Sequence, residues 1–415
     1  MKRLVLALVF SIPGAAFAQD TSIKLPPGFT ATVIVDGLVN ARHMAIRGND
    51  IYVSTNHTNA DPGPQAIHAI RLGSDHKLVQ VTTLGNVWGG TGIRIHDGAL
   101  YAANGTTVWR YQLDEGLVPK AAPQAIVEGM QNRNNRNRIL AFDESGGLYV
   151  ALSGDGNNAC AAGGRLSATP GPNPCPELAD RAGIWRFSAT KPGQKFSDGE
   201  HYAVGIRNMT AFRWSARHKA LYGILHDRDD GAQVWPQYFT KAEELAVGDA
   251  LYRISRGTDF GWPYSYYDGV RNQRIQAPEY GGDGKKLAEK KADTPVLSMV
   301  VEPSKAAPVD MVFYDATQFP AAWRGGLFIS RHGGIGPARP GGYEGYDIVY
   351  LPMDAQGRPG KVIPFASGFA GPSPDDRTIA RAAHRPNGMA LAPDGALFVV
   401  DSKNGRLWRI AYTGN

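Results

Sequence analysis

One pattern of hydrophobic and polar residues recurs six times along the chain. Each copy has an apolar stretch, a tight turn rich in Asp, Asn, Gly or Ser, and a second run of small, aromatic and apolar residues. Alternation with a period of two is typical of β-strands, and this turn chemistry joins neighbouring strands into hairpins. The copies are HMAIRGNDIYVST from His43, GIRIHDGALYAAN from Gly92, ILAFDESGGLYVALS from Ile139, MTAFRWSARHKALYGIL from Met209, MVFYDATQFPAAWRGGLFIS from Met311 and GMALAPDGALFVVD from Gly388. The pattern therefore predicts six β-hairpins.

A third strand follows most of these hairpins, as in TVWRYQL, GIWRFSA, ALYRISR and RLWRIAY. Six copies of a multi-stranded unit predict an all-β fold, a six-bladed β-propeller over residues 19–415. A helical solenoid is excluded, because its hydrophobic period would be about 3.6 residues. The last copy stops at its third strand, so we expect residues 29–37 to supply the fourth strand and to close the ring.

The blades are expected to carry their long insertions on one face. Residues 154–183, 226–248 and 331–345 lengthen three of the connections between second and third strands. In an up-and-down blade these loops share a face with the start of each first strand. Sites form where loops meet on a rigid scaffold, so this mouth of the central channel is the expected functional site.

Arginine residues stand where several first strands begin. Four of them take this position: Arg42, Arg138, Arg207 and Arg385. Guanidinium groups form paired hydrogen bonds with carboxylates and keep their charge when partly buried, so the set indicates an anionic ligand. One arginine per blade could instead belong to the architecture of the propeller, paired with Asp229, Asp230 or Asp310.

The chain begins like an exported protein. A basic start at Lys2 and Arg3, an apolar run over residues 4–10 and the triplet Ala-Phe-Ala at 16–18 are typical of a signal peptide, residues 1–18. We expect cleavage between Ala18 and Gln19 and a periplasmic or secreted mature protein; a buried N-terminal element is the alternative. No later run approaches the roughly 20 apolar residues of a membrane span. Without the two basic residues the formal charge falls from +6 to +4 (6 − 2), which gives no indication of nucleic-acid binding.

The chain has two cysteines, Cys160 and Cys175, in one segment rich in Gly and Pro. In an exported protein such a pair is expected to form a disulfide. Zinc and iron–sulfur sites need more soft ligands than this, and no Cys-x-x-Cys-His motif for covalent haem occurs.

Three segments resemble the PQQ-dependent glucose/sorbosone dehydrogenase family, and within it the sorbosone and pyranose dehydrogenase branch. They are LPPGFTATVIVDGLVNARHMAI near the start, GIRNMTAFRW with GILHDRDD and GDALYRISRGTDFGWPYSYYDG in the middle, and RPNGMALAPDGALFVVDSKNGRLWRI near the end. The resemblance spans essentially the whole mature chain. It implies a six-bladed propeller that holds PQQ and Ca²⁺ at the channel mouth and oxidises a sugar or a sugar-derived aldehyde.

The resemblance also implies roles for individual residues. Arg385 matches an arginine on a cofactor carboxylate, while Arg207 and Asn208 match the pair beside the quinone carbonyls. His332 matches a cationic or imidazole contact to the cofactor. The backbone carbonyls of the pair Asp227-Arg228 match a loop that helps to hold Ca²⁺, a cation that accepts carbonyl oxygens. The residues implied in cofactor binding are Arg42, Arg138, Asn208, Arg228, His332 and Arg385.

The implied reaction is hydride transfer from a substrate carbon to PQQ, while a general base takes the hydroxyl proton. Relatives use a histidine just ahead of the third blade, but this chain has Asn134 and Asn135 there. An amide accepts no proton near neutral pH, so either His226, His332 or Asp227 serves, or the protein is a weak or non-catalytic relative. The candidate catalytic residues are Arg207, His332 and Asn135.

Three functions remain open. The first is a periplasmic PQQ- and Ca²⁺-dependent dehydrogenase that passes electrons to a cytochrome c or a quinone. The second is a gluconolactonase-like propeller hydrolase, which needs a channel metal held by Glu, Asn and Asp. The third is a non-catalytic propeller that binds a carbohydrate or another ligand. Four aromatic residues could stack on a sugar or cofactor ring, or pack the rim of a blade: Trp262, Tyr264, Tyr266 and Tyr267.

Overall fold

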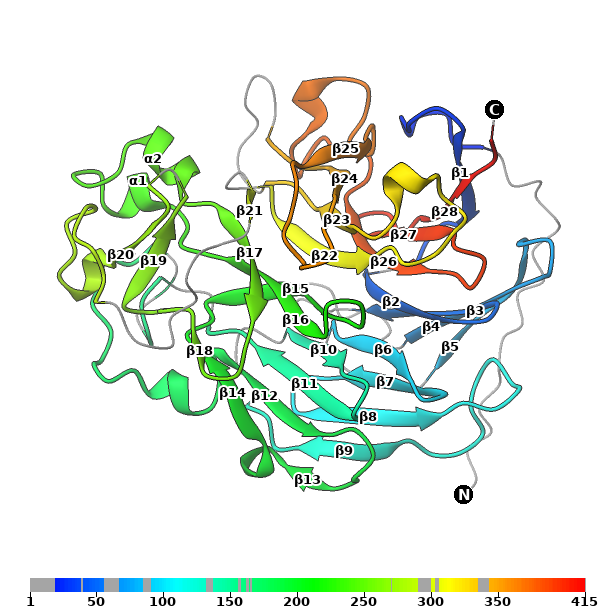
Figure 1. The fold of residues 1–415 in the computed structure, drawn as a ribbon, viewed down its shortest axis with the longest axis horizontal. Coiled ribbons are helices and arrows are strands. Elements are labelled where there is room, and N and C mark those ends of the chain that lie inside the picture. Colours follow the sequence, from blue (N-terminus) through cyan, green and yellow to red (C-terminus); the bar gives the residue numbers. More distant parts are fainter. Residues whose placement is uncertain are drawn as a thin grey trace.

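The computed structural model describes residues 19–38, 40–55, 67–84, 91–131, 137–155, 158–161, 164, 166–269, 271–289, 300–302, 306–334 and 343–414. The predicted signal peptide and the two asparagines Asn134 and Asn135 lie outside these residues. Six sheets of four or five strands are arranged in a ring around one axis (Figure 1). The predicted six-bladed β-propeller is confirmed.

Each blade has four principal strands in meander order, with the first strand innermost. Blade 1 contains β2 (Ala41–Arg47), β3 (Asp50–Thr55), β4 (Ile67–Leu72) and β5 (Leu78–Leu84). Blade 2 contains β6 (Ile93–His96), β7 (Ala99–Ala103), β8 (Thr107–Gln112) and β9 (Gln124–Glu128). Blade 3 contains β10 (Arg138–Phe142), β11 (Gly147–Leu152), β12 (Gly183–Ser188) and β14 (Glu200–Val204).

The second half of the chain repeats this arrangement. Blade 4 contains β15 (Asn208–Ser215), β16 (Ala220–His226), β17 (Asp249–Ile254) and β21 (Val300–Glu302). Blade 5 contains β22 (Pro308–Phe313), β23 (Leu327–Arg331), β24 (Asp347–Leu351) and β25 (Ile363–Ala366). Blade 6 contains β26 (Pro386–Leu391), β27 (Leu397–Asp401), β28 (Leu407–Tyr412) and β1 (Phe29–Val35). Two short strands, β13 (Gln194–Lys195) and β18 (Thr258–Asp259), extend blades 2 and 3.

Blade 6 joins the two ends of the chain. β1 pairs antiparallel with β28, with Phe29 opposite Tyr412 and Thr32 opposite Arg409. The predicted closing strand is therefore confirmed, and it covers the edge that β28 would otherwise expose. The innermost strands β2, β6, β10, β15, β22 and β26 contact one another in a closed ring and line the central channel.

The hydrophobic core lies between neighbouring blades. Alternation along each strand sends side chains to both faces of a sheet, where they pack against the next blade. At the closing seam the ring of Phe29 meets Phe319 at 4.8 Å and Phe365 at 5.2 Å in edge-to-face contacts. Tyr52 on β3 is fully buried, and its hydroxyl donates to the carbonyl of Leu117 at 3.0 Å. This packing makes the ring a firm support for its loops.

Insertions of blade 4 form an annex on one side of the ring (Figure 1). It contains the helices α1 (Gly231–Val234) and α2 (Lys241–Ala246) and the hairpin of β19 (Ser265–Asp268) and β20 (Gln273–Gln276). Single 3-10 turns occur at Pro176–Ala179, Phe196–Asp198, Pro278–Tyr280, Ala321–Trp323 and Pro374–Asp376. Within the described residues, no helix has the length and apolar character that a bilayer crossing requires.

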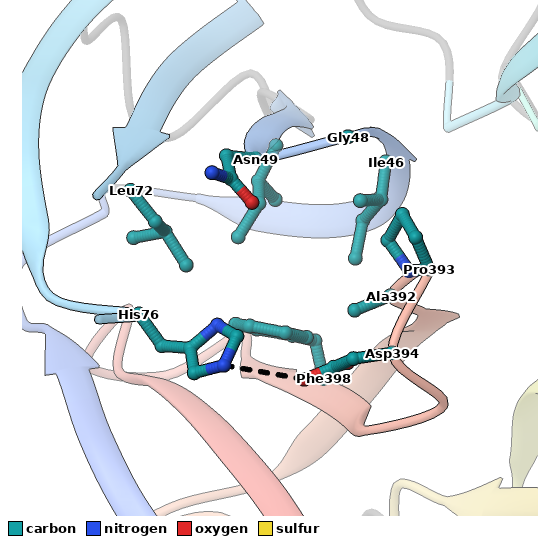
Figure 2. Close-up of a pocket in the computed structure, with 10 residues that line it drawn as sticks. Ile46, Gly48, Asn49, Leu72, His76, Ala392, Pro393, Asp394 and Phe398 are labelled. Carbon is teal, nitrogen blue, oxygen red and sulfur yellow. Dashed lines mark ion pairs between the residues drawn. The ribbon is translucent and has the colours of Figure 1, made fainter. Parts of the chain in front are cut away.

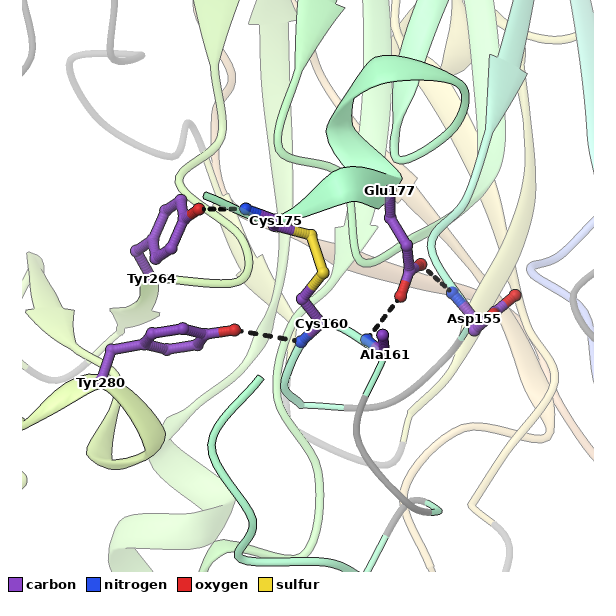
Figure 3. The surroundings of a disulfide bond; sticks show 7 residues. All are labelled: Asp155, Cys160, Ala161, Cys175, Glu177, Tyr264 and Tyr280. Atoms are coloured by element: carbon purple, nitrogen blue, oxygen red, sulfur yellow. Dashed lines mark hydrogen bonds between the residues drawn. A yellow bond between two sulfur atoms is a disulfide. The ribbon is translucent and has the colours of Figure 1, made fainter. Parts of the chain in front are cut away.

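A disulfide closes the third-blade insertion where it contacts the annex. Cys160 and Cys175 are bonded, as predicted. The amide of Cys160 donates to the hydroxyl of Tyr280 at 3.2 Å, and that of Cys175 donates to the hydroxyl of Tyr264 at 2.7 Å (Figure 3). Trp262 packs in the same buried cluster. Tyr264 and Trp262 thus fasten one loop to another, in agreement with the packing alternative for the aromatic residues.

Candidate functional site at the channel mouth

Two arginines and a histidine meet at the mouth where the inner strands begin. Arg42 lies next to the first residue of β2, Arg385 immediately precedes β26, and His332 immediately follows β23. These strands belong to blades 1, 6 and 5, and β26 contacts the other two. The propeller therefore brings together three of the candidate residues that are distant in the sequence.

Backbone carbonyls and an aromatic ring fix the position of Arg385. Its guanidinium donates to the carbonyls of His332 at 3.1 Å and Gly333 at 2.6 Å. It also lies 5.5 Å from the ring centre of Tyr346, a cation–π contact. Burial lowers the pKa of Arg385. The charge is thus held in place by neutral groups rather than by an ion pair.

Arg42 and His332 complete a cationic cluster with Arg385. Burial, together with the charge of Arg385, lowers the pKa of Arg42. The Nε2 atom of His332 is hydrogen-bonded to Oγ of Ser402 at 2.6 Å. Burial and the charges of Arg385 and Arg42 hold the pKa of His332 well below its usual value, so its ring is neutral near pH 7.

One buried carboxylate, Asp401, acts on both arginines. Its oxygens accept from Nδ1 of His384 at 2.9 Å and from three backbone amides. These hydrogen bonds lower the pKa of Asp401 although burial opposes this. None of the ion pairs among the described residues includes Arg42 or Arg385. Two guanidinium groups therefore face one carboxylate, and an anionic ligand would complete the charge balance.

Arg207 is paired, as the architectural alternative proposed. Its Nη1 donates to the carbonyl of Asp227 at 2.7 Å, and its Nη2 lies 3.1 Å from Oδ2 of Asp229. The residue is only 3% exposed. Arg207 therefore positions the loop after β16, and that loop carries the carbonyls expected to hold Ca²⁺.

Asn208 and His226 face each other at the ends of β15 and β16. Oδ1 of Asn208 accepts from Oγ of Ser153 at 3.1 Å, and its Nδ2 lies 3.4 Å from Nδ1 of His226. Nε2 of His226 lies 2.5 Å from the carbonyl of Pro308. Because a carbonyl only accepts, Nε2 carries the proton, and Nδ1 of His226 is left as an acceptor.

The side chains of Asp227 and Arg228 turn into the annex. The Asp227 carboxylate accepts from the amides of Arg228 at 2.8 Å and Tyr267 at 2.9 Å, and burial raises its pKa. The Arg228 guanidinium makes two hydrogen bonds to Glu279, at 3.0 and 2.7 Å. The Arg228 side chain is therefore engaged in a buried ion pair, and its contact with a cofactor stays a prediction. The backbone carbonyls of this loop stay the candidates for Ca²⁺.

Arg138 lies in a second group of buried arginines at the start of blade 3. It is fully buried and donates to the carbonyls of Asn137 at 3.0 Å and Gln131. Arg181, which the sequence analysis missed, is equally buried, donates to the same Gln131 carbonyl at 3.4 Å and is paired with Asp155. The one signal for Arg181 in the sequence was its position as a basic residue just before the third strand of blade 3. Asn135 lies beside this group in sequence, outside the described residues.

A small apolar pocket lies away from this mouth, between blades 1 and 6 (Figure 2). It has a volume of about 120 Å³, and Ile46, Leu72 and Phe398 form its walls. His76 and Asp394 stand 3.4 Å apart at its edge. None of the candidate site residues lines it.

The fold and the charged mouth define a class: six-bladed propellers of the type found in PQQ-dependent sugar dehydrogenases. The chain belongs to the TrAA12-like family, whose model matches residues 23–413. No curated protein matches the sequence. The family resemblance expected from the sequence is confirmed.

Three solved structures illustrate the likeness in fold. The iodide structure of the family AA12 carbohydrate-active enzyme of Trichoderma reesei has a TM-score of 0.72 at 14% identity and covers 97% of this chain and 100% of that one. The holo PQQ domain of a pyranose dehydrogenase from Coprinopsis cinerea has a TM-score of 0.68 at 16% identity, covering 96% and 98%. The apo soluble aldose sugar dehydrogenase of Escherichia coli has a TM-score of 0.58 at 16% identity, covering 92% and 99%.

Proposed function

We propose that the protein is an exported oxidoreductase that oxidises a sugar or a sugar-derived aldehyde with PQQ bound at the cationic mouth. The cluster of Arg42, Arg385 and His332 carries this proposal, because its two guanidinium groups face a single carboxylate. The carboxylates of PQQ would accept charge-assisted hydrogen bonds from these arginines. The neutral ring of His332 would contact the cofactor without adding a third charge.

Ca²⁺ would be held on the loop after β16. The described residues contain no group of three or more His, Cys, Asp or Glu side chains placed to bind a metal. A cation here would therefore depend on the carbonyls of Asp227 and Arg228 and on the cofactor itself, an oxygen set that Ca²⁺ accepts. The Asp227 carbonyl already accepts from Arg207 but has a second lone pair. A calcium structure of a family AA12 enzyme is among the similar folds.

Bound PQQ would supply the electron-accepting carbonyl, and the protein would supply position and proton transfer. His226 is the base that the geometry favours, because its Nε2–H is held by the Pro308 carbonyl and its Nδ1 is an acceptor whose neighbour, the Asn208 amide at 3.4 Å, a substrate hydroxyl would replace. Asn208 fixes the other side of the same ring. His332 is less suited to accept a proton, since Arg42 and Arg385 oppose a further positive charge beside it.

Dye reduction by the purified chain with PQQ and Ca²⁺, across sugars and sugar-derived aldehydes, tests the proposal. A His226→Asn variant is expected to bind PQQ but to lose turnover by roughly 10²-fold or more, the usual contribution of a general base. A His332→Asn variant should lose mainly cofactor affinity. His76→Asn, at an exposed turn far from the mouth, is the matched control. Equal turnover in the His226 variant and the wild type would contradict this assignment.

A non-catalytic ligand-binding propeller is the second candidate. It is favoured by Asn134 and Asn135, which stand where relatives place the catalytic histidine. PQQ or carbohydrate binding without dye reduction would support it. In the catalytic case electrons would pass to a separate acceptor, a cytochrome c or a quinone, and reduction of each can be followed by absorbance. Lactone hydrolysis without PQQ would instead support the hydrolase alternative.

A further inference from the structure

The channel has a second opening at the opposite end of the inner strands. A cavity of about 340 Å³ lies there, against residues late in the innermost strands of five blades. On β2, for example, Arg42 at the start faces the first mouth, whereas Met44 and Ile46 line the cavity. We call this cavity the far mouth. None of the predicted site residues lines it.

Arg213 spans the channel at the inner end of the far mouth. From β15 it reaches Asp310 on β22, with Nη2 at 3.0 and 3.1 Å from the two carboxylate oxygens, and the Met389 carbonyl on β26 at 3.2 Å. Asp310 is fully buried and also accepts from the amides of Met311 and Met389, each at 2.9 Å. Arg213 and two backbone amides therefore occupy the hydrogen-bond acceptors of the Asp310 carboxylate.

Arg94 is a second arginine beside the same carboxylate, and it shares this ion-pair partner with Arg213. Its Nη2 stays 3.8 Å from Oδ1 of Asp310. Its other contacts are the carbonyls of Ile93 at 2.7 Å and Phe212 at 3.5 Å, while Nε has no hydrogen-bond partner. The residue is 8% exposed. Burial and the charge of Arg213 lower the pKa of Arg94.

Among the buried groups at this end of the channel, the charge balance is positive. Two guanidinium groups share Asp310, and burial lowers the pKa of the neighbouring His43 to about 4, so that ring is neutral. Asp315 stands at the exposed rim and forms no ion pair with either arginine in the described structure. A buried charge that is only partly balanced is costly, and an anion from solution would relieve that cost.

Apolar side chains form part of the wall around these charges. Val312, Phe313, Leu391 and Trp214 line the cavity together with Met44. Both arginine side chains keep a small exposed area, 10% for Arg94 and 15% for Arg213, and both line the cavity. A concave apolar wall with a few convergent charges is typical of a small-molecule site.

We propose that the far mouth binds a small carboxylate with an apolar body, its carboxylate on Arg94 and Arg213 and its body against Val312 and Leu391. Guanidinium groups bind carboxylates in this way because their donors match the spacing of the two oxygens. The site is separate from the cationic mouth and does not depend on PQQ. It would act as a second ligand site of the propeller.

The probe for this site is 4-bromobenzoate. Anomalous diffraction from wild-type crystals soaked with it should place bromine in the far mouth. Calorimetric titration should show saturable binding that weakens with added salt. An Arg94→Met variant should bind roughly tenfold more weakly or worse, because a charge-assisted hydrogen bond is lost. Arg253→Met, which removes an exposed arginine of blade 4, should bind as the wild type does.

Three results would overturn the proposal: bromine only at the cationic mouth, no saturable binding at millimolar probe, or unchanged binding in the Arg94→Met variant. If that variant fails to fold, Arg94→Lys keeps a charge without the planar fork and should bind with intermediate affinity. Equal affinity of the lysine variant and the wild type would exclude a forked contact. The diffraction result on the wild type decides the location without any variant.

Discussion

Replacing Glu279 with glutamine removes the charge that balances a buried arginine in the annex. Arg228 and Glu279 have side chains that are 3% and 0% exposed, and two hydrogen bonds join them. Trp235 donates to the same carboxylate at 2.9 Å, and the Arg228 guanidinium lies 5.4 Å from the ring centre of Phe239. Glutamine keeps one acceptor oxygen but leaves the Arg228 charge without a counter-charge.

The expected cost follows from this burial. Breaking a buried ion pair by neutralising one partner costs about 3–5 kcal/mol, because the remaining charge cannot be solvated. The Arg228→Met variant should cost a similar amount, since it leaves the carboxylate buried. Changing both residues should cost less than the sum of the two single changes, with a coupling of about 1–3 kcal/mol between neighbours.

Denaturant unfolding followed by tryptophan fluorescence measures these free energies. Glu128→Gln is the matched control, because its partner Lys195 and Glu128 itself are 65% and 39% exposed. Such a surface pair contributes at most about 1 kcal/mol.

Hydrogen bonds from Arg228 lower the pKa of Glu279 even though burial opposes this. The stabilisation by ionised Glu279 is therefore fully present above about pH 4.3, the pKa of a glutamate in the unfolded chain. It is lost as the pH falls through the lower pKa of Glu279 in the folded protein. A loss below about 1 kcal/mol in Glu279→Gln would refute the reasoning.

Two further predictions concern stability. Replacing Cys160 and Cys175 with serine opens a loop of sequence separation 15 and should cost about 3 kcal/mol in denaturant unfolding; an unchanged midpoint would contradict this. Burial depresses the pKa of His43 from 6.5 to about 4, so the unfolded chain binds the proton first and stability falls as the pH drops between these values. The loss is about 3 kcal/mol ((6.5 − 4) × 1.36), and His43→Gln should reduce this part of the pH dependence; parallel pH curves for the two proteins would contradict it.

The propeller was predictable from sequence because its signals are local. Alternation with a period of two and a polar turn define each hairpin within about 15 residues, so the copies at His43 and Gly388 could be recognised alone. The closing strand at residues 29–35 followed from a missing fourth strand. The cysteines of the third-blade insertion lie close together behind a predicted signal peptide, which made their pairing an expected outcome.

The pairing of charges was not predictable, because it depends on contacts across the ring. Arg228 is balanced by Glu279 from a separate insertion, and Arg207 by Asp229 from the neighbouring strand end. Arg385, at an equivalent strand start, has carbonyls instead of a carboxylate. Their positions in the sequence do not distinguish the arginines that have a carboxylate partner from those that do not. Only the packed loops show which of these arginines has a carboxylate partner.

Binding of PQQ at the cationic mouth is tested most directly by calorimetric titration of PQQ into the Ca²⁺-saturated protein. Saturable binding is expected for the wild type, and a loss of roughly 10- to 100-fold for Arg385→Met, since a hydrogen bond to a charged group contributes about 1.5–3 kcal/mol. Arg358→Met, at an exposed turn, should leave the affinity unchanged. Absence of saturable binding, or equal affinity in the Arg385→Met variant and the wild type, would contradict the assignment of this mouth as the cofactor site.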